Sequence, residues 1–177
     1  MKYIVASDIH GSIYWLNKLL EKANSIKPDK IILLGDLYYH GPRNTLPIEY
    51  NPMEVSRKLN NIKDQLIVIK GNCDALVDEM ISDFKFLPYY EEVINNKKCY
   101  FTHGHEYNID DIKNDVDVLI YGHFHTGFIK TLNKQVFINS GSITLPKNNT
   151  PHSYLVMEDN VITLFDFEDN VISEISI

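Results

Sequence analysis

The chain has 177 residues, of which 44% are hydrophobic and 23% charged, and this composition fits one globular domain with a sizeable core. Its formal net charge is -7 and its Lys and Arg residues are not clustered, so a surface for binding nucleic acid is disfavoured. No apolar stretch approaches the length of a membrane span or a signal-peptide core, and the two cysteines show no CxxC spacing. We therefore expect a single cytoplasmic domain over residues 1–177.

Three apolar runs in the first half of the chain predict buried strands, and helical patterns follow them. Apolar residues recur at helical spacing from Ile13 to Ala23, which predicts a helix after the first run. Asn51, Pro52 and Glu54 are typical of a second helix start, with a capping residue, a first-turn proline and a capping-box acid. The predicted strands are residues 3–6 (YIVA), 31–34 (IILL) and 66–69 (LIVI).

The pattern changes in the middle of the chain. Asp74 is predicted to cap a short helix over residues 75–82. From Pro88 onward short β-type runs predominate, and TLNKQVFI (131–138) is typical of a hairpin. The acidic segment 110–117 is predicted to be a solvated loop or helix end. A βαβ first half and a mostly β second half predict an α/β domain, with no composition shift that marks a domain boundary.

Five apolar runs end directly in side chains that can bind a metal. In open α/β sheets the loops beyond the carboxyl ends of the strands form the ligand crevice, so side chains distant in sequence converge there. Six of the seven histidines lie at these ends or in the loops that follow, and only His152 lies elsewhere. The five segments are YIVASDIHG (3–11), IILLGD (31–36), LIVIKGNCD (66–74), CYFTHGH (99–105) and VLIYGHFH (118–125).

Each segment alone also has an ordinary explanation. SDIHGS can be a turn before a helix capped by Ser12, and GD is a common turn dipeptide. In GNCD, Cys73 can be a small buried residue and Asp74 a helix cap. The repetition of such residues at the end of each strand is what indicates a metal site.

The series DxH, GD, GNxD, HGH and GHxH, in this order, resembles the signature of the calcineurin-like metallophosphoesterases. Within that superfamily the chain is similar to the compact bacterial and archaeal phosphodiesterases, and NSGSITLPK (139–147) resembles the NPGS segment of the family. The resemblance implies a four-layer α-β-β-α sandwich, in which two mixed β-sheets pack face to face between flanking helices.

The resemblance also implies two divalent metal ions per chain. One carboxylate has two oxygens and can bind both ions of a two-metal site. Imidazole and oxygen ligands without an obligate thiolate suit Mn²⁺, which we place first, and also Ni²⁺, Fe²⁺, Co²⁺ or Zn²⁺. The implied ligands are Asp8, His10 and His125 for one ion, Asn72, His103 and His123 for the other, and Asp36 as a bridge between them.

The implied activity is a dinuclear metal-dependent phosphoesterase, a phosphodiesterase or phosphatase that acts on a small phosphoester by in-line attack of a metal-bridging hydroxide. Two Asp ligands carry -2 and two divalent ions +4, which leaves +2 at the site and lets an acidic protein bind an anion. Many relatives have a histidine where this chain has Cys73, so the residue that acts as general acid is not assigned. The candidate catalytic residues are Asp36, Asn72, His103, His105, His40 and Arg43.

His40 and Arg43 follow Asp36 and are candidates for contacting the phosphate, while His105 and His40 are candidates for the general acid. The main alternative is a non-catalytic protein-interaction scaffold of the same fold, as in a retromer subunit. It is disfavoured because all seven ligand positions are filled. A nuclease is disfavoured by the charge. We expect no membrane partner, and a homo-oligomer is left open.

Overall fold

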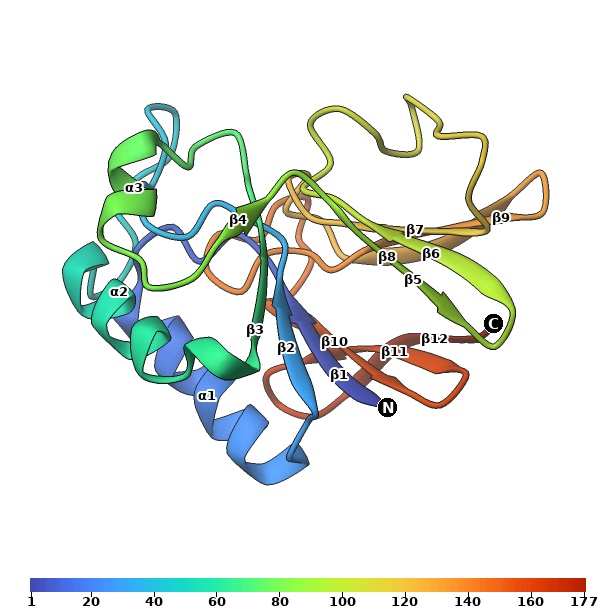
Figure 1. Ribbon diagram of the computed structural model, residues 1–177, viewed down its shortest axis with the longest axis horizontal. Coiled ribbons are helices and arrows are strands. Elements are labelled where there is room, and N and C mark those ends of the chain that lie inside the picture. The colour runs from blue at the N-terminus through green and yellow to red at the C-terminus, as the bar shows by residue number, and fades with distance from the viewer.

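In the computed structural model, which describes residues 1–177, twelve strands form two sheets packed face to face (Figure 1). The strands are β1 (Lys2–Ala6), β2 (Lys30–Leu33), β3 (Leu66–Ile69), β4 (Phe86–Leu87), β5 (Tyr90–Ile94), β6 (Lys97–Phe101), β7 (Val118–Tyr121), β8 (Phe128–Leu132), β9 (Gln135–Asn139), β10 (Ser153–Glu158), β11 (Val161–Asp166) and β12 (Val171–Ser176). The seven-stranded sheet has the order β12-β11-β10-β1-β2-β3-β4, and the five-stranded sheet has the order β5-β6-β7-β9-β8.

Both sheets are mixed, and each contains a parallel set that carries site residues at its carboxyl ends. In the larger sheet β1, β2 and β3 are parallel neighbours. In the smaller sheet β6 pairs in parallel with β7, and β7 with β9. The predicted hairpin is confirmed: β8 and β9 are antiparallel, and Asn133 and Lys134 have positive φ angles of 50° and 72°, as two-residue hairpin turns require.

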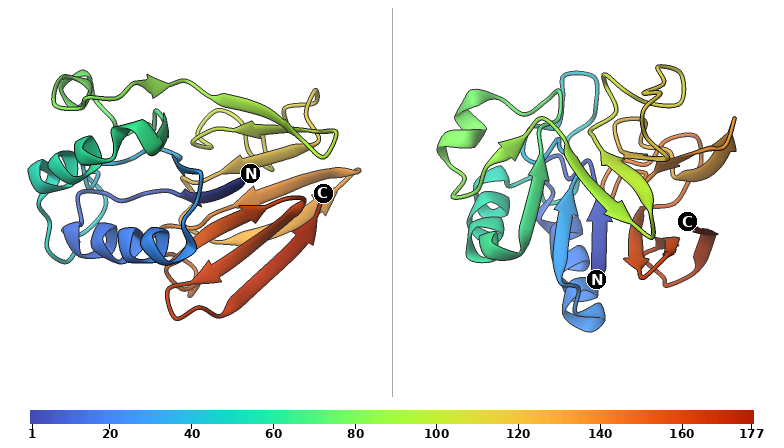
Figure 2. Two further views of the ribbon diagram at one scale, coloured as in Figure 1. Left: turned by 60° about the horizontal axis from the view of Figure 1, so that its bottom comes forward. Right: turned by 45° about the vertical axis from the view of Figure 1, so that its right-hand side comes forward.

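The outer face of the seven-stranded sheet is covered by α1 (Ile13–Ile26) and α2 (Pro52–Asn61) (Figures 1 and 2). The 3-10 turn η1 (Lys63–Gln65) follows α2, and the short helix α3 (Leu76–Met80) exposes Leu76, Val77 and Met80 to solvent. Ser12 caps α1 by accepting the N–H of Trp15, and Asn51 caps α2 by accepting the N–H of Glu54, as predicted. The Glu54 carboxylate binds Arg57 instead of closing a capping box. No helix is both long and apolar enough to cross a bilayer.

The strands next to the centre are apolar along their whole length because both of their faces are buried. In β1, Ile4 packs in the core under the helices, whereas its neighbour Val5 packs in the core between the sheets. Across that inter-sheet core lie Phe101, Ile120 and Ile138 of the smaller sheet, all fully buried. This double burial explains why YIVA, IILL and LIVI show no polar alternation, and it gives the strand ends a rigid support.

The outer face of the five-stranded sheet is covered by a loop and not by helices. Buried Tyr100 and Tyr121 on that face pack against Tyr107 and Ile109 of segment 102–117. The expected pair of mixed sheets is therefore confirmed, but the expected flanking helices are present on one side only. Within the loop, Asn108 Oδ1 accepts the backbone N–H groups of the residues two and three positions later, a local turn that competes with helix formation.

Candidate metal centre

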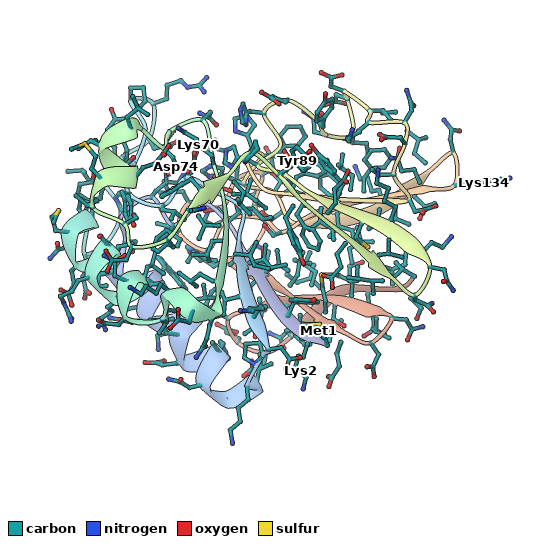
Figure 3. The ribbon with its side chains drawn as sticks, viewed as in Figure 1. Met1, Lys2, Lys70, Asp74, Tyr89 and Lys134 are labelled. Atoms are coloured by element: carbon teal, nitrogen blue, oxygen red, sulfur yellow. The ribbon has the colours of Figure 1, made fainter.

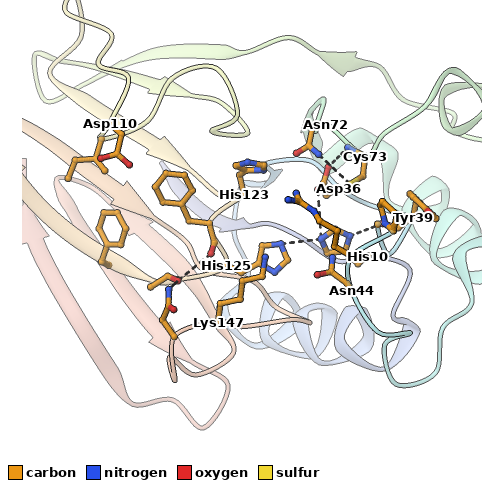
Figure 4. Close-up of a pocket in the computed structure, with 18 of the residues that line it drawn as sticks. His10, Asp36, Tyr39, Asn44, Asn72, Cys73, Asp110, His123, His125 and Lys147 are labelled. Carbon is orange, nitrogen blue, oxygen red and sulfur yellow. Dashed lines mark hydrogen bonds and ion pairs between the residues drawn. The ribbon is translucent and has the colours of Figure 1, made fainter.

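Seven side chains converge where the carboxyl ends of β1, β2, β3, β6 and β7 meet, and Figure 4 shows several of them around one pocket. The two sheets are joined there by hydrogen bonds. The backbone N–H of His123 donates to Asp8 Oδ2 at 3.0 Å, and His103 Nδ1 lies 2.7 Å from the carbonyl oxygen of Leu34. The seven residues are those that the family resemblance implies as ligands: Asp8, His10, Asp36, Asn72, His103, His123 and His125.

Asp8, His10 and His125 form one compact set of donor atoms. The Nε2 atom of His125 lies 3.2 Å from Asp8 Oδ1, and that of His10 lies 3.5 Å from the same oxygen. The two Nε2 atoms are 3.3 Å apart. Asp8 Oδ1 is buried and accepts no hydrogen bond. A buried carboxylate oxygen without a donor is costly unless a cation compensates its charge, so this set suits a metal ion.

A second set lies beside the first. His103 Nε2 is 3.0 Å from Asn72 Oδ1 and 3.2 Å from His123 Nδ1. His103 is fully buried, whereas His123 is half-buried and Asn72 is exposed at the rim. Two imidazole nitrogens and an amide oxygen thus face one another, and all three can offer a lone pair to a borderline divalent ion.

Asp36 lies between the two donor sets, and one of its carboxylate oxygens faces both of them. Its Oδ2 lies 3.4 Å from His103 Nε2 and 3.7 Å from His10 Nε2. Its Oδ1 accepts the backbone N–H of Cys73 at 2.8 Å. A bridge through both oxygens is expected from the sequence, but only Oδ2 faces both sets, while the hydrogen bond to Oδ1 fixes the carboxylate plane.

Asp74 supports this arrangement, and its predicted role as a helix cap is wrong. The helix α3 begins after Ala75, whose N–H is accepted by Asp78. The Asp74 carboxylate instead accepts the backbone N–H groups of Asp36 and Leu37, at 2.8 Å each, and that of Gly71 at 2.7 Å. Donors from the loops after β2 and β3 satisfy both oxygens, so this site outcompetes the helix cap.

Gly71 lets two strand ends approach closely. A Cβ atom at this position would lie 2.2 Å from Asp36 Oδ1 and 2.4 Å from the Asp36 backbone nitrogen, closer than any non-bonded carbon contact. The glycine of the GNCD motif is therefore required to seat Asp36 against the loop that follows β3.

Three backbone carbonyls fix the histidine tautomers. The Nδ1 atoms of His10, His103 and His125 lie 2.7, 2.7 and 2.6 Å from the carbonyl oxygens of Tyr39, Leu34 and Leu145, respectively. Because a carbonyl can only accept, each Nδ1 carries a proton and donates, so Nε2 is the ring nitrogen that can bind a metal in the neutral imidazole. The sequence pattern gave no sign of these carbonyls, since any residue supplies one.

The backbone at the cluster is itself unusual. Asp8, His10, Asp36, His123 and His125 have φ angles of 59°, 48°, 56°, 63° and 58°. Non-glycine residues rarely adopt this left-handed conformation, and such residues gather at functional sites where the surrounding fold enforces them. The conformation turns the chain sharply after each strand and directs closely spaced side chains, such as Asp8 and His10, to the same point.

The charges of the cluster shift its pKa values in opposite directions. Burial lowers the pKa of His103, but the hydrogen bond to Asp36 and the charges of Asp8 and Asp36 outweigh it and raise this pKa to about 9. Burial and the neighbouring His103 lower the pKa of His123 to about 4. Burial raises the pKa of Asp8, but the neighbouring imidazoles of His10 and His125 outweigh it and hold this pKa well below the usual range. The carboxylates of Asp8 and Asp36 are thus ionised, and their negative charge favours the binding of cations.

A cavity of about 1030 Å³ opens above the cluster and extends to both sides of it. Figure 4 shows His123 and His125 between Asp110 on one side and Asp36, Cys73 and Tyr39 on the other. We call the part lined by the loops after β2 and β3 the helix-side arm, and the part lined by the segments after β6 and β7, by β8 and by the loop after β9 the sheet-side arm. The first comprises Tyr39, Gly41, Pro42, Arg43, Asn44, Asn72 and Cys73, and the second Ile109, Asp110, Phe124, Thr126, Phe128, Lys130, Lys147 and Asn148.

The remaining predicted site residues differ in position. Arg43 lines the helix-side arm. His105 is exposed, with its ring centroid 5.5 Å from that of His103, but it does not line the cavity. His40 does not line it either, because its ring packs against Tyr50 at 5.3 Å and its buried Nδ1 has no hydrogen-bond partner. The structure thus brings Arg43 to the cavity and keeps both extra histidines out of its lining.

Comparisons with known proteins agree with this geometry. A family model for the calcineurin-like phosphoesterase superfamily domain matches residues 1–160. The phosphodiesterase YfcE of Escherichia coli K12 is 33% identical over 181 residues, which cover 100% of this chain and 98% of that protein. The probable metallophosphoesterase YsnB of Bacillus subtilis is 31% identical, with 99% and 96% covered.

Solved structures give the same result. A structure of Yfce, a phosphoesterase from E. coli, superposes with a TM-score of 0.95 at 31% identity and covers 99% of both chains. Vacuolar protein sorting 29 of Cryptosporidium parvum has a TM-score of 0.66 at 20% identity, with 99% of this chain and 97% of that chain covered. At 20% identity, the similarity to vacuolar protein sorting 29 shows only that the two proteins share a fold.

Proposed function

We propose that this chain, which belongs to the calcineurin-like phosphoesterase superfamily and is a metal-dependent hydrolase of phosphate esters, holds two divalent ions and acts on phosphodiesters. The observation that carries the proposal is Asp36 Oδ2, which faces His10 of one donor set and His103 of the other. When bound, such ions lower the pKa of a shared water and neutralise charge on the phosphoryl oxygens.

The donor set fits such ions. Asp8 Oδ1 is buried without a hydrogen-bond donor, and the fixed tautomers of His10 and His125 direct nitrogen lone pairs towards it. Asp8, His10 and His125 would hold one ion, and Asn72, His103 and His123 the other. Mixed nitrogen and oxygen ligands suit Mn²⁺, which remains our first choice, and equally admit Ni²⁺, Fe²⁺, Co²⁺ or Zn²⁺.

The residues of the helix-side arm would handle the substrate. Arg43 forms no ion pair and offers a forked, permanently charged group to the phosphoryl oxygens. Asn72 and Asp36 would hold the reacting phosphate close to the cluster through the ions that they bind. His105 and His40 remain candidates for the proton donor, of which His105 lies nearer to the second donor set.

A diester fits this cavity better than a monoester does. A phosphodiester carries two ester groups, and the cavity extends to both sides of the histidines that mark its centre. With the phosphate over the cluster, each arm can take one ester group. A monoester would leave one arm filled by water only.

The test compares bis(p-nitrophenyl) phosphate with p-nitrophenyl phosphate on the Mn²⁺-loaded protein, since both release the same leaving group. We expect a higher kcat/KM for the diester, loss of both activities on metal removal, and loss in Asp36→Asn. The matched control, Asp159→Asn, changes an exposed turn residue and should retain activity. Absence of metal-dependent hydrolysis would overturn the proposal in favour of a non-catalytic scaffold.

A further inference from the structure

The sheet-side arm has an aromatic wall that metal binding does not require. Phe124 and Phe128 both meet the fully buried Tyr121 edge to face, with ring centroids 5.5 and 6.1 Å apart and interplanar angles of 89° and 80°. Each of the two phenylalanines is half-buried and lines the cavity. Tyr121 thus holds two rings in place while they stay open to a ligand.

A free cation lies against this wall. Lys130 Nζ lies over the Phe128 ring at 4.7 Å from its centroid, because residues 128 and 130 point to the same face of β8. Lys130 forms no ion pair, although the chain carries 24 acidic residues. An unpaired ammonium and an aromatic surface are therefore presented side by side in one arm of the cavity.

We propose that the sheet-side arm binds a nucleotide-type ester group, with an aromatic base against Phe124 and Phe128 and a second phosphate at Lys130. This assignment rests on the proposed phosphodiesterase function and specifies its substrate class. A nucleotide combines, within one group, the ring and the anion that this arm would recognise. Asp110 in the same arm can accept a hydrogen bond from a base N–H or a sugar hydroxyl.

The size of the cavity agrees with such a ligand. Small-molecule pockets commonly measure ~300–1,000 Å³, and this cavity of about 1030 Å³ is slightly larger. A phosphate with two small alkyl groups would fill only the part above the cluster. A nucleoside with an additional phosphate would occupy the sheet-side arm as well, and stacking on aromatic side chains tolerates any base.

Three ligands that share one phosphomonoester test the proposal step by step: methyl phosphate, thymidine 5′-phosphate and thymidine 3′,5′-bisphosphate. Calorimetry on the Mn²⁺-loaded protein gives the Kd of each. We expect the nucleoside to tighten binding at least ~5-fold, as stacking on aromatic side chains typically does. The second phosphate should tighten it about 3-fold further, the effect of one exposed ion pair.

Variants of Phe128 and Lys130 test which residue causes each of the two gains in affinity. Phe128→Ala should remove most of the gain from the nucleoside, and Lys130→Gln most of the gain from the second phosphate. Lys134→Gln is the control, because Lys134 lies at the tip of the β8–β9 hairpin, away from the cavity (Figure 3), and both gains should persist there. Equal Kd values for the three ligands, or gains that persist in both cavity variants, would overturn the proposal.

The same preparation separates this proposal from the one on which it rests. If bis(p-nitrophenyl) phosphate is hydrolysed with metal while the three Kd values are equal, the nucleotide assignment is wrong and the phosphodiesterase assignment stands. If no metal-dependent hydrolysis occurs, the phosphodiesterase assignment is wrong, and with it the substrate class that we infer for the arm.

Discussion

The buried carboxylate of Asp74 accepts the backbone N–H groups of Asp36 and Leu37, at 2.8 Å each. These bonds fix the residue whose single oxygen faces both donor sets. Asp36 in turn accepts the N–H of Cys73, the residue that precedes Asp74. The loops after β2 and β3 thus hold each other by reciprocal carboxylate-to-backbone bonds, and the position of Asp36 depends on Asp74.

We predict that Asp74→Asn weakens metal binding about 10–100-fold, the usual effect of losing a group that orients a ligand. The amide nitrogen of asparagine cannot accept, so at least one backbone N–H is left unpaired, which costs about 1–3 kcal/mol of stability. Metal titration and thermal unfolding measure the two effects, with Asp159→Asn as the control. Unchanged metal affinity in Asp74→Asn would show that Asp36 is held in place without Asp74.

The part of the site that the sequence predicts consists of side chains at strand ends. The apolar runs mark where strands stop and so place Asp8, His10 and His125 at strand ends. Their grouping around one ion follows from the family resemblance, because β1 and β7 lie in different sheets. Asp74 could not be placed in this way. Its neighbours 75–82 form a helical pattern that favours a local cap, while two of its three donors, the N–H groups of Asp36 and Leu37, lie 38 and 37 positions earlier in the chain.

Contacts made by the backbone could not be predicted from the sequence either. The carbonyls of Tyr39, Leu34 and Leu145 orient imidazoles, yet every residue has a carbonyl. The sheet-side arm carried a weak signal, since Phe124 lies inside the GHFH motif and Phe128 follows four residues later. Its function depends on how β7 and β8 place these rings around Tyr121, which no local pattern encodes.

We predict that His123→Ala abolishes turnover and removes tightly bound metal with little loss of stability, because His123 is half-buried and its ring stands at the cavity. The change in unfolding free energy should stay within about 1 kcal/mol. His103→Ala should also lose activity but cost about 2–3 kcal/mol, since it empties a fully buried site and leaves the Leu34 carbonyl without a donor. Rates, metal content and unfolding are measured together. Retained turnover in both variants would remove the second donor set from the mechanism.

We predict that the rate falls steeply as the pKa of the leaving group rises. Cys73 lines the cavity at the position where the family resemblance implies a histidine in many relatives. A thiol is a weaker acid than an imidazolium, and a general acid contributes ~10²–10⁴-fold for poor leaving groups. Aryl diesters should react far faster than alkyl diesters, and Cys73→His should narrow the gap at least ~10-fold.

A series of aryl and alkyl phosphodiesters checks this dependence in the wild type, Cys73→His, His105→Ala and His40→Ala. The opposite result is a shallow dependence in the wild type that steepens when one histidine is removed. That histidine would then be the proton donor, and the role assigned to Cys73 would be wrong.

We predict that His152 makes the fold less stable in mild acid. Its ring stacks on Trp15 at a centroid distance of 3.7 Å, and burial lowers its pKa from the ordinary 6.5. As the pH falls below that value, the unfolded chain takes up this proton before the folded chain does, so stability declines. In His152→Phe, which keeps an aromatic ring on Trp15, Tm should fall less between about pH 8 and about pH 5.5. An equal fall in both proteins would contradict the prediction.

Anomalous diffraction from crystals grown with Mn²⁺ tests the two-ion centre most directly. We predict two peaks per chain, one beside Asp8, His10 and His125 and the other beside Asn72, His103 and His123, with Asp36 Oδ2 in contact with both. Asp36→Asn should weaken both peaks, because it removes the oxygen that the two sites share. A single peak in the wild type, or two peaks that Asp36 does not join, would contradict the account.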